Sequence, residues 1–241
     1  WQPTEMPATW LANVLSGALR RHIPARAFVE SLRCALSSVP VRALVLAESD
    51  DLLWSIPREL ECNYGFDVGV ADLRDPDALR AAVYATRVPD LIVTTTFSAM
   101  GARELGKRLN RPVCAVTMCC ELYTRVRICL EESDVYFIVA DPDLAERLRV
   151  IFAPHPRHDR FHALVQGRDD YTALPADATL YVTQLARKRM LERRPARALE
   201  ADLCKRSIPE AGVFSDESAL ELLTFIVRAN LSASQSSLNA I

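Results

Sequence analysis

The sequence predicts an α/β protein with two small parallel-sheet lobes, a ligand cleft between the lobes and a helical connector before them. Two patterns indicate this class. From residue 41 onward, short apolar runs alternate with amphipathic segments, as expected of strand–helix–strand units. The alternation comes in two series, one on each side of residue 118. A chain of 241 residues, 50% hydrophobic and 25% charged, is large and apolar enough to bury the cores of both lobes.

Residues 1–40 are expected to form the connector. One amphipathic helix should cover about residues 9–21, and a second should begin at Pro24, a favoured first-turn residue. Apolar residues of the second helix recur at helical spacing: Phe28, Leu32 and Leu36. Two such helices need a surface to pack on, so we interpret them as a lead-in to the lobes rather than as a domain.

Lobe 1 is expected to comprise residues 41–118, completed by a C-terminal helix within residues 207–241. Its strands are the apolar runs at residues 43–47, 68–70, 91–93 and 113–116. The amphipathic stretches between them are expected helices, at about residues 51–63, 75–86 and 98–109. The C-terminal helix should begin after Ser215, a suitable N-cap, because the leucines and valine that follow recur at helical spacing.

Lobe 2 is expected to comprise residues 119–206. Its strands are predicted at residues 135–139, 161–165 and 179–182, and the last should lead into a helix at residues 185–191. Residues 121–132 are ambiguous, because Val126, Ile128 and Leu130 alternate with charges as in a strand, while a helix also fits.

Polar residues follow nearly every expected strand, and these strand ends are the candidate site. We expect a ligand to contact Thr94, Thr95, Thr96, Phe97 and Ser98 in lobe 1 and Thr183 and Gln184 in lobe 2, with Glu48, Ser49, Asp141 and Arg168 as secondary contacts. Asp72, Thr117 and Gln166 occupy similar positions. Ligands of open α/β sheets bind at the carboxyl ends of strands, where free N–H groups at helix starts favour anions. The alternative for each polar residue is that it caps the next helix.

Several functions are excluded by what the sequence lacks. It has only seven glycines and no Gly-rich phosphate loop, and no Gly-x-Ser-x-Gly motif occurs. No apolar run reaches the length of a membrane span, and a net charge of −2 gives no electrostatic reason to bind nucleic acid. We therefore expect no cofactor and no membrane contact.

The seven cysteines are odd in number and follow no disulfide or zinc spacing, which indicates a reducing cytoplasm. The adjacent Cys119 and Cys120 leave open a thiol or metal sensor, although we expect no metal site.

Four segments resemble one family of regulators. They are Ala-Phe-Val-Glu-Ser-Leu-Arg at 27–33, Asp-Leu-Ile-Val-Thr-Thr-Thr-Phe at 90–97, Leu-Tyr-Val-Thr at 180–183, and the stretch from Phe214 to Leu231. The chain is similar to the C-terminal effector domains of GntR-type bacterial transcription regulators with a two-lobed, periplasmic-binding-protein-like sensor. The resemblance implies a homodimer, an effector between the lobes, and DNA binding by a winged helix N-terminal to Trp1, since this sequence contains no helix-turn-helix.

The sequence thus favours a non-catalytic domain that senses a small, anionic effector and alters DNA binding by the upstream domain. The alternative is a two-lobed enzyme similar to uroporphyrinogen-III synthase, whose fold also pairs two α/β lobes in a chain of about this length.

Overall fold

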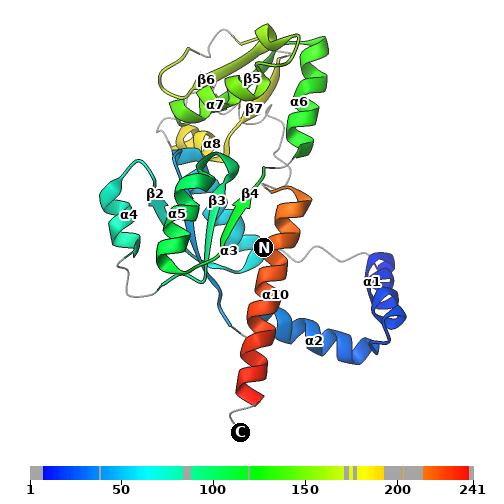
Figure 1. Cartoon of the computed structure of the whole chain (residues 1–241). Helices are drawn as coiled ribbons and strands as arrows, with labels where there is room; N and C mark the ends of the chain where they lie inside the picture. The colour runs from blue at the N-terminus through cyan, green and yellow to red at the C-terminus, as the bar shows by residue number, and fades with distance from the viewer. Residues whose placement is uncertain are drawn as a thin grey trace. The chain divides into compact units, whose positions relative to one another are not determined.

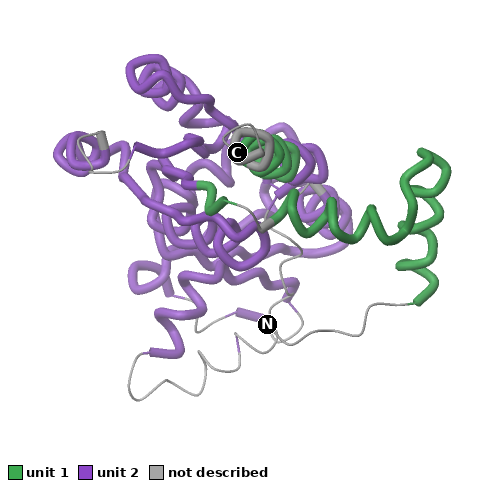
Figure 2. Tube along the Cα trace, turned by 90° about the horizontal axis from the view of Figure 1, so that it is seen from below, with its two compact units in different colours: residues 1–41, 222–241 green, residues 42–221 purple. Residues whose placement is uncertain are grey.

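The computed structural model describes residues 8–37, 39–83, 88–118, 120–170, 174–175, 178–192, 203 and 214–238, and its helices and strands are labelled in Figure 1. The chain divides into two compact units (Figure 2): residues up to 41 together with those from 222 onward, and residues 42–221. The sequence predicts that the whole C-terminal helix completes lobe 1. In the structure, residues 216–221 of this helix belong with the lobes and its remainder with the N-terminal helices.

The first unit is helical. It contains α1 (Ala8–Arg20), α2 (Ala25–Ser37) and the later part of α10 (Asp216–Leu238). His22 links α1 to α2 with a φ of 59°, a left-handed conformation that turns the chain between the two helices. The buried side chain of Asn230 accepts a hydrogen bond from the Val39 N–H and donates one to the Ile226 carbonyl at 2.9 Å, which fixes residue 39 to α10.

Lobe 1 contains a parallel sheet in the order β2-β1-β3-β4. The strands are β1 (Arg42–Ala47), β2 (Asp67–Asp72), β3 (Leu91–Thr95) and β4 (Val113–Val116). Its helices are α3 (Asp50–Tyr64), α4 (Pro76–Val83) and α5 (Ala99–Leu109). Every residue of β3 is buried, as expected of a central strand with helices on both faces.

One face of this sheet packs against α4 and α5. Leu44, Leu46 and Ile92 project from β1 and β3 into a core that includes Leu105 of α5, with Leu79 of α4 against it. Side chains alternate along a strand, so Val45 and Val93 face the other way, toward the layer that contains α3. The carboxyl ends of β1 and β3, which lie side by side, are therefore held by apolar layers on both faces.

Lobe 2 contains a smaller parallel sheet in the order β6-β5-β7. Its strands are β5 (Val135–Val139), β6 (Phe161–Val165) and β7 (Thr179–Val182), and its helices are α6 (Cys120–Glu132), α7 (Pro142–Phe152) and α8 (Gln184–Glu192). The prediction of an α/β protein with two small parallel sheets is confirmed.

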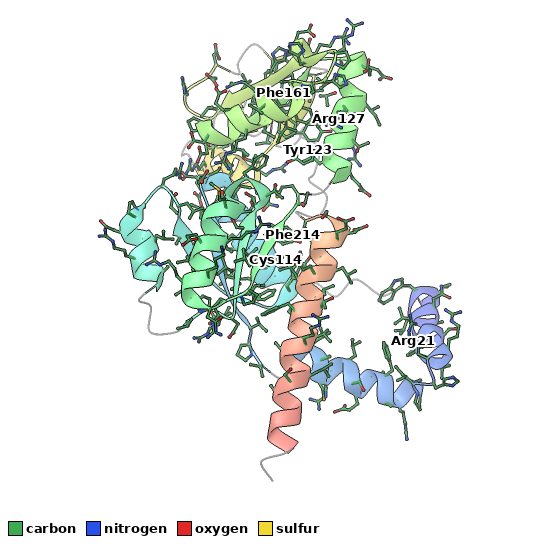
Figure 3. The ribbon with its side chains drawn as sticks, viewed as in Figure 1. Arg21, Cys114, Tyr123, Arg127, Phe161 and Phe214 are labelled. Atoms are coloured by element: carbon green, nitrogen blue, oxygen red, sulfur yellow. The ribbon has the colours of Figure 1, made fainter. Side chains whose placement is uncertain are left out.

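The two faces of the second sheet have separate cores. On the face of α6 and α7, the Phe152 ring lies 6.0 Å from Tyr123 and 4.5 Å from Phe161, two residues labelled in Figure 3. On the face of α8, Met190 packs with Ile138 and with other side chains of β5 and β7. The α7 and α8 helices therefore begin at the same edge of the sheet but on opposite faces.

The ambiguous stretch at residues 121–132 is a helix, α6. Val126 and Leu130 are fully buried, with Leu122 packed against the same core, which is the spacing of one helical face. Ile128, which the strand interpretation would place on the same face as Val126 and Leu130, is 62% exposed. None of the helices within the described part of the chain is long and apolar enough to cross a membrane.

Candidate functional site

The two lobes meet at the carboxyl ends of their strands, where the buried side chain of Asp51 joins them. One carboxylate oxygen of Asp51, at the start of α3, accepts hydrogen bonds from the N–H groups of Ala140 (3.0 Å) and Asp141 (2.9 Å), directly after β5. The other oxygen accepts one from the hydroxyl of Thr183 (2.6 Å), directly after β7. We call these four residues the Asp51 network.

Asp141 makes the reciprocal contact. As the N-cap of α7 it accepts a bond from the Asp143 N–H at 2.8 Å, and its second oxygen accepts one from the Asp50 N–H of α3 at 2.7 Å. Arg74 of lobe 1 donates to Asp141 at 3.1 Å and also pairs with Asp50 and Asp72. The Asp141 carboxylate thus caps α3 of the opposite lobe as well as its own helix α7, while the Asp51 carboxylate binds the two N–H groups that precede α7.

The pKa values of two carboxyl groups at this interface shift in opposite directions. Burial raises the pKa of Asp51 above its usual 3.8, against the effect of the three donated hydrogen bonds. The hydrogen bonds from Arg74 lower the pKa of the more exposed Asp72, and Asp72 in turn raises the pKa of Arg74. Of these two carboxyl groups, Asp51 is therefore the easier to protonate.

A second group of polar side chains lies near these contacts, and each has one buried atom that finds no hydrogen-bond partner in the described part of the chain. The atoms are Ser49 Oγ after β1, Thr95 Oγ1 at the end of β3, Ser98 Oγ, and Arg147 Nη1 on α7. Ser49, Thr95 and Ser98 are 0%, 2% and 3% exposed. We call these four residues the Arg147 cluster.

Contacts of Arg147 show that these segments come together. Its Nη2 donates to the carboxylate of Glu48, which precedes Ser49, and its guanidinium lies 5.6 Å from the ring centroid of Phe97, which precedes Ser98. Thr95 ends the strand next to β1, since Thr94 pairs with Leu46. These contacts bring the segments of lobe 1 that carry the three hydroxyl groups next to the guanidinium of lobe 2.

The hydroxyls of the cluster do not cap helices. Ser49 precedes α3, Thr95 precedes the short 3₁₀ helix η1 (Thr96–Ser98), and Ser98 precedes α5, yet none of the three makes a side-chain capping bond. The helix starts after β3 thus lack the side-chain oxygens that usually bind their N–H groups. Hydroxyls, a guanidinium N–H and a helix N-terminus together suit a small anion.

Other residues proposed from the sequence have structural partners or stand apart. Thr94 donates to the Leu46 carbonyl at 2.8 Å, and Thr183 and Asp141 belong to the Asp51 network. Thr96 is exposed, as is Arg168 in the turn after β6, and Arg168 contacts none of the other proposed residues in the described part of the chain. Gln184 begins α8 and lines a groove on another side of the lobe interface.

No sequence pattern indicates Arg147, the residue of lobe 2 that contacts the segments of lobe 1 with the unpaired hydroxyls. It lies in the middle of α7, one position before the buried Leu148, and nothing in its neighbourhood resembles a motif. Gln166, directly after β6, resembles the cluster residues, because its buried Nε2 has no hydrogen-bond partner among the described residues. Unlike Arg147, Gln166 was indicated by the sequence, because it directly follows an expected strand.

Thiol and metal chemistry finds no support in the described residues. Cys119 and the side chain of Cys120 lie outside them, so the sensor proposed for this pair has no structural description. Elsewhere in the described chain no three His, Cys, Asp or Glu residues are grouped as metal ligands. Cys114 on β4 (Figure 3) is buried, and its desolvation, with the charge of Glu221, raises its pKa to about 12. This thiol is inert at neutral pH.

The chain was compared with protein-family models, with curated proteins and with solved structures. No match was found in any of the three. The fold and the two interface groups are therefore the basis on which a function can be proposed.

Proposed function

We propose that the chain is the effector domain of a bacterial transcription regulator and that it binds a small anion at the Arg147 cluster. The observation that carries this proposal is the set of buried donors without partners. Leaving a buried polar group unsatisfied costs about 1–3 kcal/mol, so several of them in one place call for an explanation. A carboxylate or phosphate that accepts from the hydroxyls and from Arg147 would satisfy them together.

The position of the cluster suits a sensor. The three hydroxyls belong to lobe 1 and Arg147 to lobe 2, so a bound anion would contact both lobes. The lobes already touch through the Asp51 network, so binding would adjust an existing contact rather than close an open cleft. A ligand that prefers one lobe arrangement shifts the equilibrium toward it, typically by about 1–3 kcal/mol of coupling.

Regulation of DNA binding rests on the resemblance to the GntR-type effector domains. In this proposal the winged helix lies N-terminal to the helical connector, and the effector domains form a homodimer. The enzyme alternative, a protein similar to uroporphyrinogen-III synthase, has less support. The Arg147 cluster holds no carboxylate or imidazole, and Glu48 beside it is already paired with Arg147. Binding is therefore better supported than proton transfer.

Two neighbouring threonines of β3 provide the test. Thr94 and Thr95 are both buried, but the Thr94 hydroxyl has a partner and the Thr95 hydroxyl has none. Thr95→Val should stabilise the ligand-free protein by about 1 kcal/mol, because it removes an unsatisfied hydroxyl at almost constant volume. Thr94→Val should destabilise it by about the same amount, because it removes a hydrogen bond.

The same variants report on binding. Inorganic phosphate, used as the probe anion, should raise the unfolding temperature of the wild type and of Thr124→Ala, which removes an exposed hydroxyl on α6. The rise should be smaller for Thr95→Val. If Thr95→Val destabilises the protein as Thr94→Val does, and phosphate acts equally on all variants, the site is not where we place it.

A further inference from the structure

We infer that the groove between α3 and α8 is a second binding site, for an organic anion with an aromatic body. The groove has a volume of about 450 Å³ and is lined by Trp54 and Arg58 of α3 and by Gln184, Arg187, Lys188 and Leu191 of α8, with Glu192 at its end. Small-molecule sites usually measure about 300–1,000 Å³, so the groove has the size of one. It is distinct from the Arg147 cluster, because α8 and α7 cover opposite faces of the second sheet.

Positive charge is concentrated around one indole ring. The guanidinium of Arg58 lies 5.2 Å from the Trp54 ring centroid, and the ammonium of Lys188 lies 5.7 Å from it. The acid that lines the groove, Glu192, is 3.9 Å from Lys188, at the limit of an ion pair. Arg58 forms no ion pair with any described residue. Two cations held at the same ring repel each other, and an anion between them relieves that repulsion.

Apolar surface lies next to these charges. The Trp54 ring is half-buried because it packs against the core on the α8 face of lobe 2, so the ring is held in place. Leu191 is 53% exposed at the groove. A flat hydrocarbon body can lie against these two side chains while its acid group reaches Arg58 and Lys188. This combination favours an aromatic carboxylate over an inorganic ion or a neutral aromatic.

A ligand in this groove would touch both lobes. Trp54 and Arg58 lie on the helix that begins at Asp50 and Asp51, and Gln184 follows Thr183 of the Asp51 network. Arg189 of α8 also pairs with Asp50 at 3.1 Å. Occupation of the groove should therefore strengthen the existing contact between the lobes.

Calorimetry with 2-naphthoate tests the inference. We expect the whole chain to bind 2-naphthoate, and to bind acetate, which lacks the ring, and 2-naphthalenemethanol, which lacks the charge, at least about tenfold more weakly. Arg58→Gln and Lys188→Gln should each weaken naphthoate binding about threefold to tenfold, since each removes one charge contact. Arg80→Gln, which removes an exposed arginine on α4, is the matched control and should have no effect.

A second readout locates the ligand. In a heteronuclear NMR spectrum, naphthoate should shift the indole N–H resonance of Trp54 and leave that of Trp10 unchanged. The inference is wrong if naphthoate does not bind at millimolar concentration, if the neutral alcohol binds equally well, or if both charge variants bind as the wild type does. These variants differ from those that test the Arg147 cluster, so the two proposals fail separately.

Discussion

Single buried polar residues decide how the two lobes of this protein meet. Asp51 satisfies three donors of lobe 2, whereas Thr95, one residue after the bonded Thr94, satisfies none. Both are buried at the carboxyl ends of neighbouring strands. Asp51 therefore holds the two lobes together, whereas the Thr95 hydroxyl is available to a ligand in the proposed function.

Two replacements of Asp51 should separate the contribution of its hydrogen bonds to stability from that of its charge. Asp51→Ala leaves two N–H groups and a hydroxyl without an acceptor, so we expect a loss of about 3 kcal/mol in the free energy of unfolding. Asp51→Asn should be milder, because its amide oxygen can accept from Ala140 and Asp141 while its amide nitrogen donates to Thr183. Urea denaturation measures both changes, and an alanine variant as stable as the asparagine variant would contradict the role of the network.

The stability difference between the wild type and Asp51→Asn should change with pH in a known direction. Because burial raises the pKa of Asp51 in the folded state, the folded chain holds this proton more tightly than the unfolded chain does. The contribution of Asp51 to stability is therefore most favourable below its usual pKa of 3.8 and is lost as the pH rises through the raised value. The asparagine side chain does not titrate, so Asp51→Asn should gain stability relative to the wild type between pH 4 and pH 7, by about 1.4 kcal/mol per unit of pKa shift. A constant difference over that range would contradict the raised pKa.

At the scale of elements, the sequence predicted the described strands of the two lobes because each contains a short apolar run, and the central strands β1, β3 and β5 are buried on both faces. Residues 91–95 illustrate this, since no exposed face interrupts the run. The pattern was weaker at residues 121–132, where alternating apolar residues suggested a strand. Burial of Val126 and Leu130, with Ile128 outside, shows that helical spacing determined the packing there.

The candidate site could be predicted only in part. Position after a strand identified Ser49, Thr95 and Ser98, because the carboxyl ends of parallel strands share one edge. It did not distinguish them from Thr94 and Thr183, whose hydroxyls donate hydrogen bonds to other groups of the protein. That difference depends on which groups of the other lobe come within hydrogen-bond distance, and local sequence does not encode it.

Two glycines of α5 should respond oppositely to the same substitution. A Cβ at Gly106 would lie 2.5 Å from Val113 Cγ2 and 3.0 Å from the Arg111 carbonyl oxygen, so Gly106→Ala should destabilise the protein by about 1–3 kcal/mol. No atom lies within 4 Å of a Cβ at Gly101, where alanine should stabilise the helix by about 0.5–1 kcal/mol. Thermal unfolding of the two variants measures the changes. Equal shifts would mean that α5 does not pack closely on β4.

At the scale of the whole molecule, the helical unit presents apolar side chains that its own helices do not cover. Val29, Leu32 and Leu36 of α2 are 60%, 44% and 47% exposed and follow one another at spacings of three and four residues, so they form one stripe. On α10, Leu231 of the same unit is also exposed. A continuous stripe on one helix indicates a protein interface more strongly than scattered leucines do. In the proposed function the chain forms a homodimer, and a second copy of it would supply a matching stripe.

Leu32→Asp should therefore convert a homodimer into a monomer. A buried carboxylate in the middle of the stripe would have to lose its hydration without gaining a partner, which costs far more than the contact of one leucine contributes. Val150→Asp is the matched control, because Val150 is 70% exposed on α7 and lies outside the helical unit. Sedimentation velocity at matched concentrations should show dimers for the wild type and for Val150→Asp and monomers for Leu32→Asp, with circular dichroism confirming that all three remain folded. A wild type that sediments as a monomer, or a Leu32→Asp variant that still dimerises, would show that α2 is not a dimer interface. Neither result would bear on the two proposed binding sites between the lobes.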